Sequence, residues 1–153
     1  MKTTYELMRE QPLLAGLNDW QLEHLAADAQ RAIIHAGNRV FREGDPADRM
    51  WLIVDGRIDV DTRLPDRGDV IIDTLGPGDV LGWSWLFPPY RWHFGAVARE
   101  TALTVELDGP RVRELCQRDP GLGYHFITGL FQVVTDRLQA TRRRLIDEMR
   151  TGA

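Results

Sequence analysis

The fold is decided by the stretch Leu75-Gly76-Pro77-Gly78-Asp79-Val80-Leu81-Gly82-Trp83-Ser84-Trp85-Leu86-Phe87. The stretch predicts a turn, a very short strand, a tight glycine and the start of a short helix. A glycine in front of a helix start directs free backbone N–H groups toward one point, which favours an anion. Because an aromatic-rich loop and a further strand follow, this pattern is typical of a small β-barrel that holds a phosphate group.

Composition places the chain among single-domain globular proteins. It has 153 residues, of which 43% are hydrophobic and 27% charged, and its formal net charge is −4. The negative balance argues against a nucleic-acid-binding protein, which is usually basic. The single cysteine, Cys116, excludes an internal disulfide and favours a reducing compartment. The first residues lack the apolar core of a signal peptide and no apolar run reaches membrane-spanning length, so we expect a cytoplasmic protein without a membrane partner.

Hydrophobic periodicity divides this single domain, residues 1–153, into three zones. Apolar residues recur at helical spacing in residues 1–30, whereas residues 31–108 contain short alternating runs that predict strands. Among the turns between them, Asp55-Gly56 predicts a type I′ hairpin, because both residues tolerate positive φ angles. The helical period returns in residues 109–150, where Asp119-Pro120-Gly121 is expected to break one helix and a last helix to run from Tyr124 to Met149.

The last helix carries a heptad pattern. Residues spaced alternately by four and three form a seam, which consists of Ile127, Phe131, Val134, Leu138, Thr141 and Leu145. A second apolar stripe beside it consists of Phe126, Leu130 and Val133. Two stripes indicate two partners. We expect the second stripe to pack on the barrel of the same chain and the seam to form a homodimer.

Three motifs carry a resemblance to a known family. They are Phe41-Arg42-Glu43-Gly44-Asp45, Met50-Trp51-Leu52-Ile53-Val54-Asp55-Gly56 and Leu75-Gly76-Pro77-Gly78-Asp79. In this order and spacing they resemble the cyclic nucleotide-binding domain, the sensor of the Crp/Fnr regulators, over essentially the whole chain. The resemblance implies a mainly β fold with flanking helices: a double-stranded β-helix, or jelly roll, with N-terminal helices and a long C-terminal dimerisation helix. It also implies a non-catalytic sensor for signal transduction, whose phosphate-binding cassette begins at Gly82.

The cassette departs from the family's pattern at the positions that hold the ligand. Trp83 stands where the family has a glutamate that accepts the ribose 2′-hydroxyl, and His93 stands where it has the phosphate-binding arginine. Tryptophan offers no acceptor, and neutral histidine offers one donor in place of the arginine fork. We therefore expect cyclic AMP to bind weakly, unless Arg91 replaces the missing arginine.

Aromatic residues crowd the same region and admit two interpretations. They either fill the pocket themselves, or remodel it for a ligand other than an ordinary cyclic nucleotide, such as a small anionic or flat aromatic molecule. The aromatic residues are Trp83, Trp85, Phe87, Tyr90, Trp92 and Phe94. In the terminal helix, Thr141 stands where the family's hydroxyl contacts the base, although it fits the seam equally well. The candidate pocket residues are Gly82, Trp83, Ser84, Trp85, Arg91, Trp92, His93 and Thr141.

Other classes of function have less support. A metal enzyme needs converging ligands, but the histidines are scattered and form no His-x-His pair, so we expect neither a metal site nor an enzyme. The chain ends at Ala153 without room for a helix-turn-helix, so we expect no direct DNA binding from it. If it were cut from a longer protein, it would be the sensor half of a transcription regulator. The remaining alternative is a ligand-free scaffold for dimerisation or for a protein partner.

Overall fold

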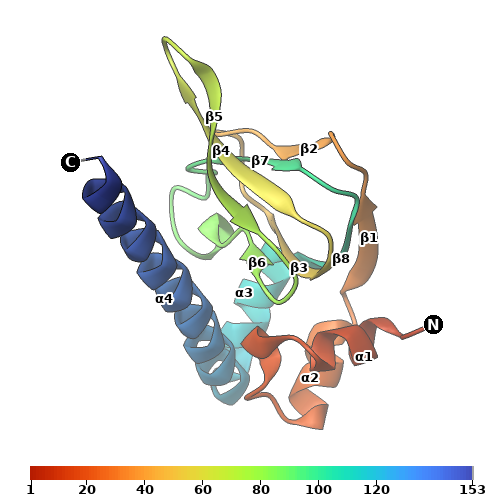
Figure 1. The fold of residues 1–153 in the computed structure, drawn as a ribbon. Coiled ribbons are helices and arrows are strands. Elements are labelled where there is room, and N and C mark those ends of the chain that lie inside the picture. Colours follow the sequence, from red (N-terminus) through yellow and green to blue (C-terminus); the bar gives the residue numbers. More distant parts are fainter. Residues whose placement is uncertain (153) are drawn as a thin grey trace.

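The computed structural model describes residues 1–152 and begins with a helical preface (Figure 1). The preface has three short segments, which are α1 (Thr4–Arg9), the 3-10 turn η1 (Pro12–Leu14) and α2 (Asp19–Ala26). Each α-helix starts at a capping box, in which Thr3 pairs with Glu6 and Asn18 with Gln21. Pro12, at the first position of η1, separates α1 from the rest.

The strands that follow form two antiparallel sheets packed as a jelly roll. Within the described residues they are β1 (Gln30–Ile34), β2 (Arg39–Phe41), β3 (Arg49–Asp55), β4 (Ile58–Leu64), β5 (Gly68–Leu75), β6 (Val80–Leu81), β7 (Gly95–Ala98) and β8 (Ala102–Asp108). The strand order is β1-β8-β3-β6 in one sheet and β2-β7-β4-β5 in the other. The predicted fold class, mainly β with flanking helices, is confirmed.

The hairpin predicted at Asp55-Gly56 is wrong. β3 and β4 lie in different sheets, so the chain crosses between the sheets at this turn. Of the two residues, Gly56 alone has a positive φ, 89°, and a Cβ there would lie 2.6 Å from Ala102 Cα. Glycine is therefore required because two backbones meet. The long hairpin of the fold is β4–β5, which projects beyond the barrel (Figure 1).

Two helices, α3 (Gly109–Arg118) and α4 (Pro120–Thr151), complete the fold. α4 begins at Pro120 instead of the predicted Tyr124, because proline is well suited to the first helical position. The Asp119 side chain caps the helix by accepting the Leu122 N–H at 3.1 Å. Further along, α4 touches the preface so closely that a Cβ on Gly129 would lie 2.0 Å from Leu13 O. α4 then runs along the side of the barrel (Figure 1).

The buried side chains form two clusters that meet at β3. The helical core lies among the preface, α3, α4 and one sheet, and includes Leu13, Met50, Leu52, Trp85, Val105, Leu122 and Phe126. The barrel core lies between the two sheets and includes Trp51, Ile53, Ile58, Leu81, Trp92 and Ala96. Successive residues of β3 alternate between the two, as the period of a strand requires. The molecule therefore has a helical interior and a barrel interior on opposite faces of one sheet.

Candidate functional site

The candidate site is the β6–β7 loop, residues 82–94, which contains the 3-10 turn η2 (Ser84–Leu86). Gly82 follows β6 with a φ of 89°, a conformation that favours glycine. The Leu86 N–H donates to Trp83 O at 3.1 Å, so the N–H groups of buried Ser84 and of Trp85 precede the first hydrogen bond of the turn. The backbone therefore has the shape expected of a glycine turn that could face an anion.

Trp92 occupies the space beside this turn. A Cβ on Gly82 would lie 2.7 Å from Cη2 of Trp92, so the edge of the indole rests against the glycine backbone. The Trp92 side chain is buried and stacks on Phe41, with ring centroids 3.9 Å apart and 10° between the planes. The ring of Trp51 lies 6.1 Å from that of Trp92. Protein side chains therefore fill the barrel next to the predicted phosphate turn.

Trp85 and Trp83 enter the helical core instead of the barrel. The Trp85 ring lies 6.2 Å from the ring of Phe126 and is fully buried, and its Nε1 donates to Gly82 O at 3.1 Å. The absence of a side chain at Gly109 makes room for it, since a Cβ there would lie 2.6 Å from the Trp85 side chain. Trp83, half-buried, packs against the same core. Its indole is therefore a packing group on the outer side of the barrel wall.

The aromatic residues of the loop do not form the single cluster that the sequence suggests. Trp92 belongs to the barrel core and Trp85 to the helical core, whereas Phe87 and Phe94 are 49% and 47% exposed. The cause is a change in backbone geometry within the loop. η2 is helical and places Trp85 in the helical core, whereas Trp92 follows an isolated β-bridge between Arg91 and Pro46 and joins the barrel core.

The polar candidates Arg91 and His93 flank Trp92, and both are exposed. Arg91 Nη1 donates to Gly44 O at 3.0 Å. The backbone of the same segment pairs with that turn, since the Gly44 N–H donates to Trp92 O at 2.8 Å and the Trp92 N–H to Asp45 O at 3.0 Å. Arg91 therefore helps to fasten the segment that carries Trp92 to the Gly44 turn, and its Nη1 is engaged by a carbonyl.

Arg113 of α3 is a site residue that the sequence analysis missed. Its guanidinium donates to the Trp85 carbonyl and lies over the Tyr90 ring, with Cζ 4.4 Å from the centroid. Tyr90 has a φ of 56°, which a non-glycine residue keeps only where its surroundings fix it. An arginine on an amphipathic helix carries no sequence signal that separates it from solvated neighbours. The contact is visible only in three dimensions.

The candidates on α4 divide between two faces of the helix. Four seam residues are exposed on the outward face, namely Ile127, Phe131, Leu138 and Leu145. The buried stripe consists of Leu122, Phe126, Leu130 and Val133. Val134 is half-buried against the helical core, and is therefore less available to a partner than the sequence suggests. Thr141 is exposed and accepts a long hydrogen bond from Arg144 Nη2 at 3.4 Å.

Two observations concern the titratable groups of the described residues. No three His, Cys, Asp or Glu side chains of residues 1–152 gather where a metal ion could bind. Burial raises the pKa of the Cys116 thiol to about 11, so the thiol stays protonated near neutral pH. A protonated thiol is a poor nucleophile.

Known proteins share this fold and these motifs. The family model described as the cyclic nucleotide-binding domain matches residues 32–119, more than half of the chain. A putative cyclic nucleotide-binding protein from Geobacter metallireducens superposes with a TM-score of 0.80 at 25% identity, covering 90% of this chain and 99% of that one. Cyclic nucleotide-gated ion channel 2 of Arabidopsis thaliana is 32% identical over 97% of this chain and 20% of the channel.

The CRP-like cAMP-activated global transcriptional regulator of Mycobacterium tuberculosis is 25% identical over 142 residues, which cover 93% of this chain and 62% of the regulator. The chain thus spans less than two thirds of that relative. The matched residues include strands β2 to β8, the glycine turn after β6 and α3. The chain belongs to the cyclic nucleotide-binding domain family.

Proposed function

We propose that this chain is a non-catalytic regulatory module whose barrel is closed to ordinary cyclic nucleotides by its own Trp92. The observation that carries the proposal is the contact between the Trp92 indole and Gly82, where a Cβ would meet the ring at 2.7 Å. A ligand phosphate at the Gly82 turn would have to displace a buried indole that is stacked on Phe41. That displacement lowers affinity by the cost of exposing the aromatic surface.

The absence of polar groups that could hold the ribose and the phosphate also lowers the expected affinity for cyclic nucleotides. Trp83 packs against the helical core and offers no acceptor for a ribose hydroxyl. Arg91 is engaged with Gly44 O, and His93 is exposed beside it. Loss of the charged partner of a buried phosphate costs about 3–5 kcal/mol, by analogy with breaking a buried ion pair. We therefore expect dissociation constants for cyclic AMP and cyclic GMP at or above roughly 100 μM.

Membership of the family does not fix the ligand. The mycobacterial relative is named as cAMP-activated. A solved neighbour from Trypanosoma brucei, with a TM-score of 0.64 and 20% identity, is described as the regulatory subunit of a cAMP-independent protein kinase A. The same fold therefore occurs in proteins described as cAMP-activated and as cAMP-independent. The ligand of this chain has to be inferred from the residues at the site.

Titration calorimetry with cyclic AMP and cyclic GMP tests the proposal. The wild-type chain is compared with a Trp92→Ala/His93→Arg double variant, which empties the space beside Gly82 and supplies an arginine fork. The variant should bind at least about tenfold more tightly than the wild type, since one restored charged hydrogen bond is worth about 1.5–3 kcal/mol. Trp20→Ala is the matched control, because Trp20 is an exposed tryptophan of α2, remote from the barrel core.

Low-micromolar binding of either nucleotide to the wild type would overturn the proposal. It would also indicate that Trp92 swings out when a ligand arrives. Equal, weak binding by the wild type and the double variant would mean that Trp92 is not what closes the site.

We further propose that the module works as a homodimer through the outward face of α4. Phe131 and Leu138 expose 71% and 46% of their surface, at positions seven residues apart on one stripe. Phe131→Asp together with Leu138→Asp should give a folded monomer in sedimentation velocity. Gln132→Asp together with Gln139→Asp, which add the same charge off the stripe, should remain dimeric. A wild type that is monomeric at tens of micromolar would contradict this proposal.

The cellular setting is part of the same proposal. No helix within residues 1–152 is both long enough and apolar enough to cross a membrane. The single, half-buried Cys116 is compatible with a cytoplasmic, reducing environment. A small-molecule ligand other than cyclic AMP, or a protein partner, would then set the output of the module.

A further inference from the structure

The inward face of α4 is apolar in the first half of the helix and charged in the second half. Near the preface it is apolar, and Phe126, Leu130 and Val133 are buried in the helical core. Beyond Val133 the same face carries Arg137 and Arg144, which are seven residues and thus two helical turns apart. All of residues 141–152 are exposed. The second half of α4 therefore lacks the apolar packing that fixes the first half.

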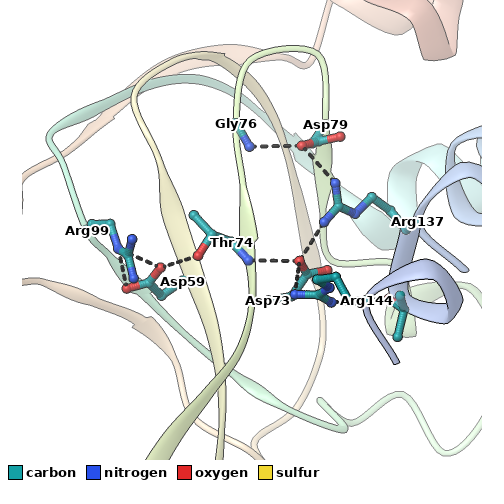
Figure 2. A network of polar contacts seen from close by, with 9 residues as sticks. Asp59, Asp73, Thr74, Gly76, Asp79, Arg99, Arg137 and Arg144 are labelled. Atoms are coloured by element: carbon teal, nitrogen blue, oxygen red, sulfur yellow. Dashed lines mark hydrogen bonds and ion pairs between the residues drawn. The ribbon is translucent and has the colours of Figure 1, made fainter. Parts of the chain in front are cut away.

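The two arginines reach the carboxylates of Asp73, on β5, and Asp79, in the turn before β6 (Figure 2). Arg137 Nη2 lies 2.5 Å from Asp73 Oδ1, and its Nη1 lies 3.6 Å from Asp79 Oδ2. Arg144 Nη1 approaches the same Asp73 oxygen at 3.5 Å. In the described chain, no other hydrogen bond or ion pair joins the barrel to the part of α4 beyond Gln132.

The acceptors are themselves held in place by the barrel. Asp73 Oδ1 accepts the Thr74 N–H at 2.9 Å, and Asp79 Oδ2 accepts the Gly76 N–H at 2.9 Å. The Thr74 hydroxyl donates to Asp59 at 2.8 Å, and Asp59 is in turn paired with Arg99 (Figure 2). The carboxylates are therefore oriented before α4 docks, which lowers the entropy cost of the ion pairs.

We propose that Asp73, Asp79, Arg137 and Arg144 form an ionic latch that holds the second half of α4 on the barrel without a ligand. The latch can open, because it is incompletely satisfied: Arg137 Nε is buried and has no acceptor among residues 1–152. A buried donor without a partner weakens the closed state. Opening frees residues 138–151 while the apolar first half stays packed. The position of the helix end thus depends on ion pairs and on ionic strength, and this inference stands apart from the closure of the barrel by Trp92.

Hydrogen–deuterium exchange of the full chain, followed by mass spectrometry of peptides, tests the latch. Asp73→Asn should speed exchange of the amides in residues 138–150 by about tenfold, since it removes the charge from the acceptor of both arginines and so favours the open state. Peptides from residues 122–133 and from β3 and β8 should be unchanged. Asp69→Asn is the matched control, because Asp69 lies on the same strand but pairs only with Arg39 and Arg63 of the barrel.

Each variant is also measured with Phe131→Asp, so that self-association through the outward stripe cannot supply the protection. In wild type, raising the salt to about 1 M, where the Debye length is about 3 Å, should reproduce part of the Asp73→Asn effect. If Asp73→Asn does not fold, Arg144→Gln, which changes only an exposed helix side chain, decides the question in the same way. Unchanged exchange in residues 138–150, or an equal change in Asp69→Asn, would overturn the latch.

Discussion

Trp85 and Trp92 leave the same loop seven residues apart and enter different interiors. Trp85 goes into the helical core, where it meets Phe126 and hydrogen-bonds to the Gly82 carbonyl. Trp92 goes into the barrel core, where it stacks on Phe41 and lies against the Cα side of the same glycine. Gly82 is thus held between two indoles, one on each face of the barrel wall.

The two tryptophans have different roles: Trp85 supports the fold, whereas Trp92 fills space inside the barrel. Trp85 joins the loop to α3 and α4, with Gly109 and Arg113 shaped around it, so its place is part of the scaffold. Trp92 fills space beside a glycine turn in a family whose members hold ligands in their barrels. One side chain should therefore be indispensable for folding, and the other should be exchangeable for a ligand.

The largest effect is expected from Trp85→Ala. The side chain is fully buried in the helical core and leaves a cavity against Phe126 that the rigid α3–α4 contact cannot fill. Deletion of a buried tryptophan side chain costs about 3–5 kcal/mol, and we expect the upper end here. Urea denaturation followed by circular dichroism measures the loss. Trp20→Ala serves as the control for an exposed tryptophan, and a loss below about 2 kcal/mol would contradict the supporting role.

A smaller loss is expected from Trp92→Ala, about 3 kcal/mol, because the remaining barrel walls stay hydrogen-bonded and the cavity adjoins the loop. The variant should instead gain a binding space, as apolar cavities of this kind take up aromatic molecules. Added indole should raise the melting temperature of Trp92→Ala and leave the wild type unchanged. A loss as large as that of Trp85→Ala, with no response to indole, would mean that Trp92 is a structural residue like its neighbour.

The sequence predicted the loop but not which of the two cores each of its aromatic residues enters. Periodicity and turn signals were sufficient for the three zones and the order of the motifs, because these are local properties. The destinations of Trp83, Trp85 and Trp92 depend on where η2 ends within the loop, and both cores accept an indole. The failed hairpin at Gly56 has the same origin. The sequence alone cannot distinguish a glycine that suits a turn from a glycine that a neighbouring backbone requires.

The sequence predicted the glycine turn of the candidate site but not which side chains would lie beside it. Gly82 carries a recognisable signal, and the absence of an acceptor at Trp83 is visible in the sequence. The contacts of Arg113 and the pairing of Arg137 and Arg144 with β5 join residues that lie far apart in the chain. Such pairings leave no periodicity, because an arginine on a helix is compatible with solvent and with an ion pair alike.

Gly82→Ala tests whether the Trp92 ring lies against this glycine. The new Cβ would lie 2.7 Å from Trp92 Cη2 at a φ of 89°, so steric conflict adds to backbone strain. We expect a loss of about 2 kcal/mol, made up of left-handed strain and overpacking. In a Trp92→Ala background the same substitution should cost only about 1 kcal/mol, since the clash with the indole is gone while the strain and a 3.2 Å contact with Arg49 O remain. Equal costs in both backgrounds would place the Trp92 ring elsewhere in solution.

The reactivity of Cys116 reports on the helical core alone, as a rate of reaction and not as a loss of stability. The thiol packs against that core, and burial raises its pKa from about 9 to about 11. An acid with a raised pKa stays protonated to higher pH, so near pH 8 the folded chain should hold about a hundredfold less thiolate than an ordinary cysteine. The rate of reaction with Ellman's reagent should therefore keep rising through pH 9 to 10, where the rate of the urea-unfolded chain levels off.

Trp92→Ala should leave the slow reaction rate of Cys116 unchanged, because its cavity opens on the barrel side of the sheet. Trp85→Ala should raise it toward the unfolded value, because Trp85 and Cys116 belong to the same core. Equal acceleration by the two substitutions would mean that the two interiors loosen together, and that the loop does not separate them.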